Sequence, residues 1–195
     1  MKTKFILHGG YTSEKNDLNQ GYFTEMVNDV SDEGNILLVY FASKDEGIEE
    51  KFQKDSDRMK SLVGDKELSI LKATKENFIE EVKSSDVIYI RGGDTQKLKA
   101  TLDEYPEFLE SIKGKTISGS SAGAYVLSKY YFTNSLNKVM EGYGCVPARV
   151  VCHYESKIHP APEGVDPISE MEKYDSSLEL ILLKDYDWQV KEIEI

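Results

Sequence analysis

The segment Gly119-Ser120-Ser121-Ala122-Gly123 places Ser121 at the centre of a G-x-S-x-G motif. It follows the strand-like run KTIS and includes the first two residues of the helix-like run AGAYVLSKY. A strand-to-helix turn of this kind holds the central serine in a strained backbone conformation, with its hydroxyl projecting above the sheet. The flanking positions favour glycine, because a Cβ there would collide with the neighbouring chain. The motif predicts a nucleophilic serine, and its plain alternative is a loop of small residues.

A nucleophilic serine needs a nearby base, and the chain contains three histidines, His8, His153 and His159. His8 follows the first predicted strand, but the two glycines after it suggest a turn. His159 lies in the Pro/Gly-rich stretch HPAPEGVDP, which is typical of a surface loop. His153 follows the strand-like run RVVC, so it is the best candidate. The alternative to a catalytic role for a lone histidine is a surface residue or a hydrogen-bonded core residue.

The segment YIRGGDTQKL places two glycines after an apolar run and before a predicted helix. Asp94 or Thr95 could simply cap that helix. In the functional interpretation, the backbone N–H of Gly93 lies close to the serine. It would then act with the N–H of Ala122, at the start of the next helix, to stabilise an oxyanion.

Alternating strands and helices must position these residues. Short apolar, β-branched runs predict strands at Lys4–Leu7, Ile36–Phe41, Leu68–Leu71, Val87–Ile90, Thr116–Ser118, Arg149–Cys152, Leu180–Leu183 and Trp188–Ile195. Amphipathic or charged segments predict helices at Leu18–Val30, Glu46–Leu62, Lys75–Lys83, Gln96–Leu102 and Pro106–Ile112. This alternation indicates βαβ units. The nearly continuous apolar runs NILLVYF and DVIYI are typical of central strands covered on both faces.

The sequence therefore predicts an α/β fold in three layers, with a mostly parallel sheet and helices on both faces. One domain over residues 1–195 is expected, because this length suits a single core. Four predicted strands end in glycine or small polar residues, in FILHGG, YFAS, YIRGGDT and ISGSSAG. Ligands bind outside the carboxyl ends of the strands in such sheets, so the four segments should share one functional edge.

Composition excludes several classes of protein. The net charge of −11 argues against a nucleic acid or an anionic membrane as the main partner. No apolar run approaches the roughly 20 residues of a membrane span, and the first run is too short for a signal peptide. The two cysteines, Cys145 and Cys152, do not form a disulfide framework in a chain of this length. A cytoplasmic location is expected. No metal-ligand spacing or phosphate-binding glycine motif is present, so no cofactor and no metal are predicted.

Together, IRGGDT, GSSAGA and PARVVCHY resemble the S51 family of serine peptidases, which includes dipeptidase E (aspartyl dipeptidase) and cyanophycinase-like proteins. The resemblance implies the flavodoxin-like fold of class I glutamine amidotransferases. It also implies hydrolysis of a small peptide through an acyl-enzyme intermediate. Ser121 would be the nucleophile and His153 its general base, and Gly93 with Ala122 would supply the oxyanion hole.

The third member of the triad departs from the family pattern, which places an acidic residue between nucleophile and histidine. Glu141 is the only carboxylate between Ala122 and Cys152, so it is the candidate that orients His153. The alternatives are a neutral group in the segment FTNSLN (Asn134, Ser135 or Asn137) or a distant carboxylate.

A second departure concerns substrate specificity. Aspartyl dipeptidases recognise an acidic side chain with an arginine beyond the catalytic histidine, whereas this chain has no arginine after Arg149. Its cations there are lysines, which supply a point charge but not a bidentate fork: Lys157, Lys173, Lys184 and Lys191. The resemblance therefore does not carry the preference for Asp-X peptides to this chain.

Two other functions remain open from the sequence. A catalytically weakened or non-catalytic relative could bind a small ligand at the same edge, which the lack of a conventional acid would favour. Glutamine amidotransferase chemistry is disfavoured, because a serine occupies the turn where those enzymes use cysteine. Cys152 precedes His153 in a predicted strand, and adjacent strand residues point to opposite faces. It is therefore expected to be a buried structural thiol.

Overall fold

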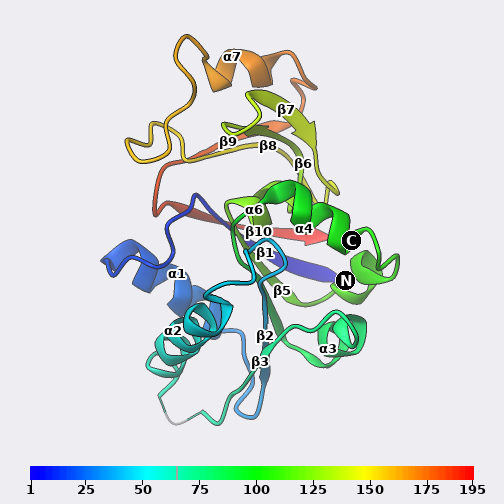
Figure 1. The fold of residues 1–195 in the computed structure, drawn as a ribbon. Helices are drawn as coiled ribbons and strands as arrows, with labels where there is room; N and C mark the ends of the chain where they lie inside the picture. The colour runs from blue at the N-terminus through cyan, green and yellow to red at the C-terminus, as the bar shows by residue number, and fades with distance from the viewer. Residues whose placement is uncertain (65) are drawn as a thin grey trace.

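A computed structural model describes residues 1–64 and 66–195. The main sheet has the strand order β10-β1-β5-β4-β2-β3 (Figure 1). Its strands are β1 (Lys2–His8), β2 (Asn35–Val39), β3 (Ser69–Lys72), β4 (Val87–Ile90), β5 (Thr116–Ser120) and β10 (Trp188–Glu194). β1 to β5 pair with one another in parallel, whereas β10 pairs antiparallel with β1. The predicted, mostly parallel sheet is confirmed.

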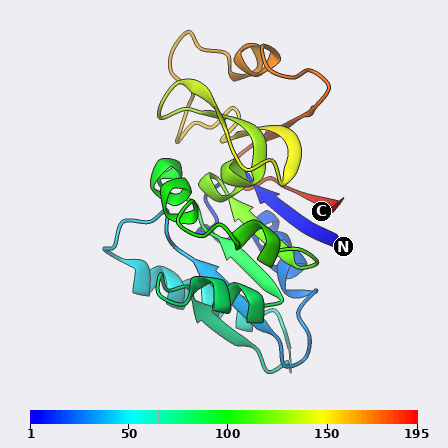
Figure 2. The same ribbon diagram turned by 90° about the vertical axis from the view of Figure 1, so that its right-hand side faces the viewer.

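Helices cover both faces of this sheet (Figure 2). They are α1 (Asp17–Val27), α2 (Ile48–Lys60), α3 (Phe78–Ser84), α4 (Thr95–Leu102), α5 (Phe108–Ser111) and α6 (Ala122–Leu127). Side chains of α1 and α2 pack with Tyr89, whereas those of α3 to α6 pack with Ile88 and Ile90. Because neighbouring strand residues point to opposite faces, the apolar run of β4 is buried on both sides. The three-layer α/β fold is confirmed.

A second, four-stranded sheet lies beyond one end of the main sheet (Figure 1) and has the order β7-β6-β8-β9. Its strands are β6 (Ser128–Thr133), β7 (Lys138–Glu141), β8 (Val146–Cys152) and β9 (Glu179–Leu183), and α7 (Pro167–Glu172) packs on it. β8 and β9 include two of the predicted strands, but their placement in a separate sheet was not anticipated.

The helix predicted after the serine is shorter than expected. α6 ends at Leu127, and Ser128 is already extended. Tyr131 and Phe132 then continue as strand β6 and are fully buried. Tyr131 stacks on Tyr125 of α6, and Phe132 packs with Val151 and Met171. These tertiary contacts, rather than a local helix preference, determine the strand conformation of this segment.

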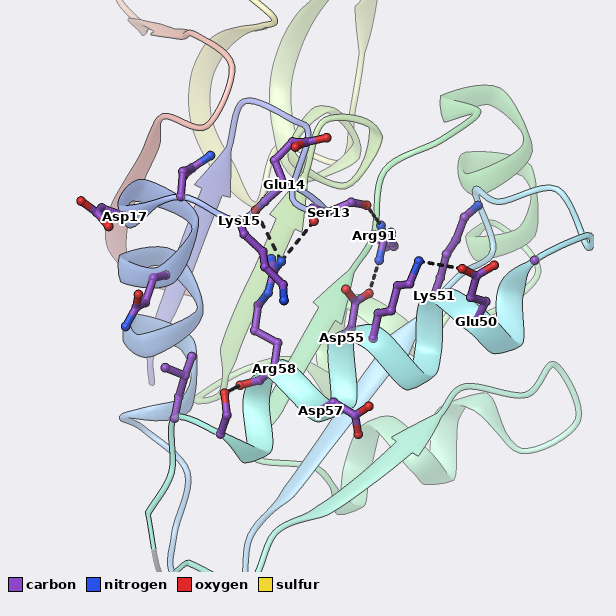
Figure 3. Close-up of a pocket in the computed structure, with 16 residues that line it drawn as sticks. Ser13, Glu14, Lys15, Asp17, Glu50, Lys51, Asp55, Asp57, Arg58 and Arg91 are labelled. Carbon is purple, nitrogen blue, oxygen red and sulfur yellow. Dashed lines mark hydrogen bonds and ion pairs between the residues drawn. The ribbon is translucent and has the colours of Figure 1, made fainter.

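A cleft of about 1090 Å³ lies between the loop at residues 13–17 and α2 (Figure 3). An ion pair between Arg91 and Asp55 forms part of its wall. Its lining includes neither Ser121 nor His153.

Within the described ranges, no helix is long and apolar enough to cross a membrane. The same residues contain no group of three or more His, Cys, Asp or Glu side chains placed to hold a metal ion.

Candidate active site

Ser121 lies at the tight turn between β5 and α6. Its backbone has φ 48° and ψ −106°, a conformation that costs energy for a residue with a side chain and is often found at functional sites. The Ser121 N–H donates to the carbonyl of His8 at 2.9 Å. A Cβ at Gly119 would lie 2.5 Å from the carbonyl carbon of Gly123, and a Cβ at Gly123 would lie 2.2 Å from the oxygen of Ile90. Close backbone packing therefore requires both glycines of the motif.

His153 directly follows β8 and meets the serine from the second sheet. Its Nε2 lies 3.0 Å from Ser121 Oγ, within the reach of a hydrogen bond between nucleophile and base. Its backbone N–H donates to the carbonyl of Gly9 at 3.1 Å. The structure thus brings together the two residues that the sequence singled out.

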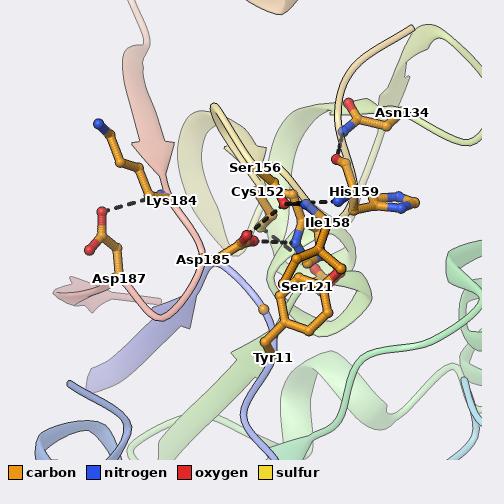
Figure 4. A network of polar contacts seen from close by, with 12 residues as sticks. Tyr11, Ser121, Asn134, Cys152, Ser156, Ile158, His159, Lys184, Asp185 and Asp187 are labelled. Atoms are coloured by element: carbon orange, nitrogen blue, oxygen red, sulfur yellow. Dashed lines mark hydrogen bonds and ion pairs between the residues drawn. The ribbon is translucent and has the colours of Figure 1, made fainter. Parts of the chain in front are cut away.

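The other ring nitrogen of His153 meets a carboxylate that the sequence analysis did not identify. Nδ1 lies 2.8 Å from Oδ1 of Asp185, and the hydroxyl of Ser156 donates to Oδ2 of Asp185 at 2.5 Å (Figure 4). Because an ionised carboxylate only accepts hydrogen bonds, Nδ1 of His153 carries the proton. Nε2 then has a free lone pair that faces the Ser121 hydroxyl.

Glu141, the expected orienting acid, lies elsewhere. It ends strand β7 and forms an ion pair with Lys129 of the neighbouring strand β6. Its side chain is 59% exposed, compared with 14% for Asp185. The partner of His153 is Asp185, and this replaces Glu141 as the candidate acid. Asn134 is not a partner either, because its amide donates to the carbonyl of His159.

The pairing of β8 with β9 explains this position of the acid. The two strands are parallel, with Cys152 opposite Leu183, so the residues that follow them emerge at the same edge. The sequence predicts both strands. His153 directly follows β8, and Asp185 is the second residue after β9. The sequence does not show that these strands pair, and the family pattern places the acid in the segment before His153.

The segment after β4 lies against the serine turn. A Cβ at Gly92 would be 3.1 Å from Ser121 Cβ, and the Gly92 N–H donates to Ser120 Oγ at 3.1 Å. Gly93 has φ 154°, and a Cβ there would lie 2.3 Å from the oxygen of Ala42. Only glycine fits this position. Asp94 then caps α4 by accepting from the N–H groups of Gln96 and Lys97.

Burial lowers the pKa of His153 below its usual value, and the neighbouring ring of His159 lowers it further. The hydrogen bond and the charge of Asp185 act in the opposite direction. His153 is therefore neutral at pH 7 and able to accept a proton. Burial also raises the pKa of the fully buried Cys152 thiol, so this thiol stays protonated and unreactive.

Arg149 is buried and its guanidinium donates to the carbonyls of Met171, Tyr174 and Leu178. These bonds hold α7 and the segment after it against the second sheet. Three of the four lysines after His153 form ion pairs with glutamates: Lys173 with Glu170, Lys184 with Glu155 and Lys191 with Glu179.

The chain matches peptidase family S51 over residues 5–188 and belongs to that family. This membership supports a peptidase function. No curated protein matches the sequence.

Two crystal structures have similar folds. One is that of a peptidase from an acI-B1 actinobacterium, with 22% identity and a TM-score of 0.71, covering 97% of this chain and 83% of that chain. The other is that of a peptidase E candidate from Listeria monocytogenes EGD-e, with 16% identity and a TM-score of 0.67, covering 100% of each chain.

Proposed function

We propose that this protein is a serine peptidase that hydrolyses a small peptide through an acyl-enzyme intermediate. The observation that carries the proposal is the continuous chain of hydrogen bonds from Ser121 Oγ through the ring of His153 to Asp185. Membership of family S51 supports the same class of reaction.

In the proposed mechanism, Nε2 of His153 removes the proton of the Ser121 hydroxyl as Oγ attacks the scissile carbonyl carbon. Asp185 holds the ring in the required tautomer and stabilises the imidazolium that forms. The N–H groups of Gly93 and Ala122 stabilise the oxyanion. His153 then gives its proton to the leaving amine, and a water activated by the same ring hydrolyses the acyl-enzyme.

The hypothesis of a non-catalytic relative depended on the lack of an orienting acid. The hydrogen bond between Asp185 and His153 removes that argument. A cysteine mechanism finds no support either, since the thiol of Cys152 is fully buried.

Labelling with a fluorophosphonate tests this proposal. The wild type is expected to be labelled, because only an activated serine reacts rapidly with this probe, and Ser121→Ala is expected to remain unlabelled. Intact mass and peptide mapping locate the adduct, and a dipeptide library then identifies the peptide hydrolysed fastest. Ser120→Ala is a matched control with the neighbouring hydroxyl removed and should still be labelled. An unlabelled, folded wild type would contradict the proposal.

The pH dependence of kcat/KM follows from the lowered pKa of His153. Activity requires the neutral ring, so kcat/KM should stay constant at neutral pH and fall only as the pH drops through this lowered pKa. The midpoint of the acid limb is therefore expected below the ordinary histidine value of about 6.5. His159→Gln removes a ring that lowers the pKa of His153, so the midpoint of this variant should lie at higher pH than that of the wild type. A wild-type midpoint above the ordinary value would contradict the lowered pKa of His153.

A further inference from the structure

His8 is a fully buried histidine at the carboxyl end of β1, next to the serine turn. Its Nδ1 accepts a hydrogen bond from the Gly10 N–H at 2.9 Å, and its Nε2 lies 2.8 Å from Oδ1 of Asn19. Since Nδ1 accepts, Nε2 carries the proton and donates to Asn19. Burial lowers the pKa of His8 to about 4, so the ring is neutral and this tautomer is kept near neutral pH.

Asn19, in the first turn of α1, is also fully buried and links His8 to the loop between β1 and α1. Its side-chain amide donates to the carbonyls of Tyr11 at 3.0 Å and Glu14 at 2.8 Å. His8 and Asn19 therefore bind three backbone groups of the loop between β1 and α1. Arg58 of α2 also holds this loop, because its guanidinium donates to the carbonyls of Ser13 and Glu14 (Figure 3).

This loop contacts His153, which acts on Ser121, and the two residues that follow Asp185. The carbonyl of Gly9 accepts from the His153 N–H, and the ring of Tyr11 lies edge-on to the His153 ring with centroids 5.1 Å apart. A Cβ on Gly10 would lie only 2.1 Å from Cε1 of His153. The backbone of the loop also holds the segment around Asp185: the Gly9 N–H donates to the carbonyl of Asp187 at 2.8 Å, and the Gly10 carbonyl accepts from the Tyr186 N–H at 3.3 Å.

We propose that His8 and Asn19 are positioning residues that keep the His153 ring and Asp185 aligned with Ser121 through the loop at residues 9–11. The inference rests on the proposed serine peptidase function. His8 transfers no proton in the reaction, because both of its ring nitrogens are engaged with Gly10 and Asn19. Its contribution is geometric: small displacements of a catalytic group cost large factors in rate.

Two substitutions at His8 separate the effect on the loop from loss of the ring alone. In His8→Gln the side-chain amide reaches toward Asn19 but supplies no acceptor at the Nδ1 position. In His8→Asn the side-chain oxygen lies near that position and can still accept from the Gly10 N–H. We expect His8→Gln to lower kcat about tenfold with little change in KM, and His8→Asn to recover most of the loss. Asn19→Ser, which removes both donations to the loop, should resemble His8→Gln.

The matched control is Ser118→Ala. Ser118 lies on the neighbouring strand β5, and its hydroxyl forms a buried hydrogen bond with Tyr22 of α1, outside the loop. All variants are compared by thermal unfolding, by kcat and KM on the peptide selected from the library, and by the rate of fluorophosphonate labelling. The NMR signal of the His153 Nδ1 proton, bonded to Asp185, is a readout that needs no turnover. It should broaden or disappear in His8→Gln and Asn19→Ser and persist in Ser118→Ala and His8→Asn.

Unchanged kcat and an unchanged His153 signal in His8→Gln and Asn19→Ser would overturn the positioning role. Equal losses of kcat in Ser118→Ala, together with an equal fall in the unfolding temperature, would overturn it as well, because they would reflect general destabilisation. An unlabelled wild type would instead refute the proposed function, and the His153 signal would still decide the positioning role. If either His8→Gln or Asn19→Ser does not fold, the other variant is tested by kcat and by the NMR signal of His153.

Discussion

Replacing Asp185 with asparagine is expected to lower kcat about 10⁴-fold, by the same logic that applies to the acid of other Ser-His-Asp triads. Asp185 fixes the proton of His153 on Nδ1. An asparagine amide at this position can donate to Nδ1 instead. The ring would then carry its proton on Nε2, facing Ser121, and could not act as the base.

Glu141→Gln is the matched control for this substitution. Glu141 was the acid expected from the sequence, and its partner in the structure is Lys129 on the surface. Exposed ion pairs contribute little to stability, so this variant should retain wild-type kcat. Both variants are measured on the peptide selected from the library, with circular dichroism to verify folding. A large loss in Glu141→Gln together with an active Asp185→Asn would reverse the assignment.

Gly10→Ala is expected to lower kcat at least about 100-fold, because displacing a catalytic group by about 1 Å can cost that much. The added Cβ would lie 2.1 Å from Cε1 and 2.7 Å from Nε2 of His153. The ring must therefore move away from Ser121 or the loop must move away from the ring. The residue also has φ 129°, which side chains rarely adopt.

Gly164→Ala is the control for the backbone strain in Gly10→Ala. Gly164 has φ 78°, and a Cβ there would meet nothing within 4 Å. Its substitution imposes strain without a clash at the site, so it should cost some stability and leave kcat unchanged. The two variants are compared by thermal unfolding and by steady-state kinetics. Full activity in Gly10→Ala would show that contact between this loop and the His153 ring is not needed.

Local patterns in the sequence were sufficient to predict much of the main sheet. The apolar run DVIYI forms β4, and the alternation of strands with helices predicted three layers. Asp94 does cap α4, one of the two capping residues expected. The sequence does not reveal the start of the second sheet, because residues 128–130 belong to the helix-like run AGAYVLSKY. Their strand conformation depends on burial of Tyr131 and Phe132.

The surroundings of His8 also depend on the tertiary structure. The sequence correctly indicated a turn after this residue, since Gly9 and Gly10 follow it. Its buried bond to Asn19 depends on the packing of α1 against β1, which residue types alone do not reveal.

The sequence by itself indicated the serine turn, because a G-x-S-x-G motif between a strand-like run and a helix-like run is typical of such a turn. It also singled out His153 as the best of three histidines. Only the tertiary structure decided which carboxylate meets that histidine. Asp185 reaches it because β8 and β9 are parallel neighbours whose carboxyl ends coincide, and strand pairing is a long-range property that no local pattern of residues encodes.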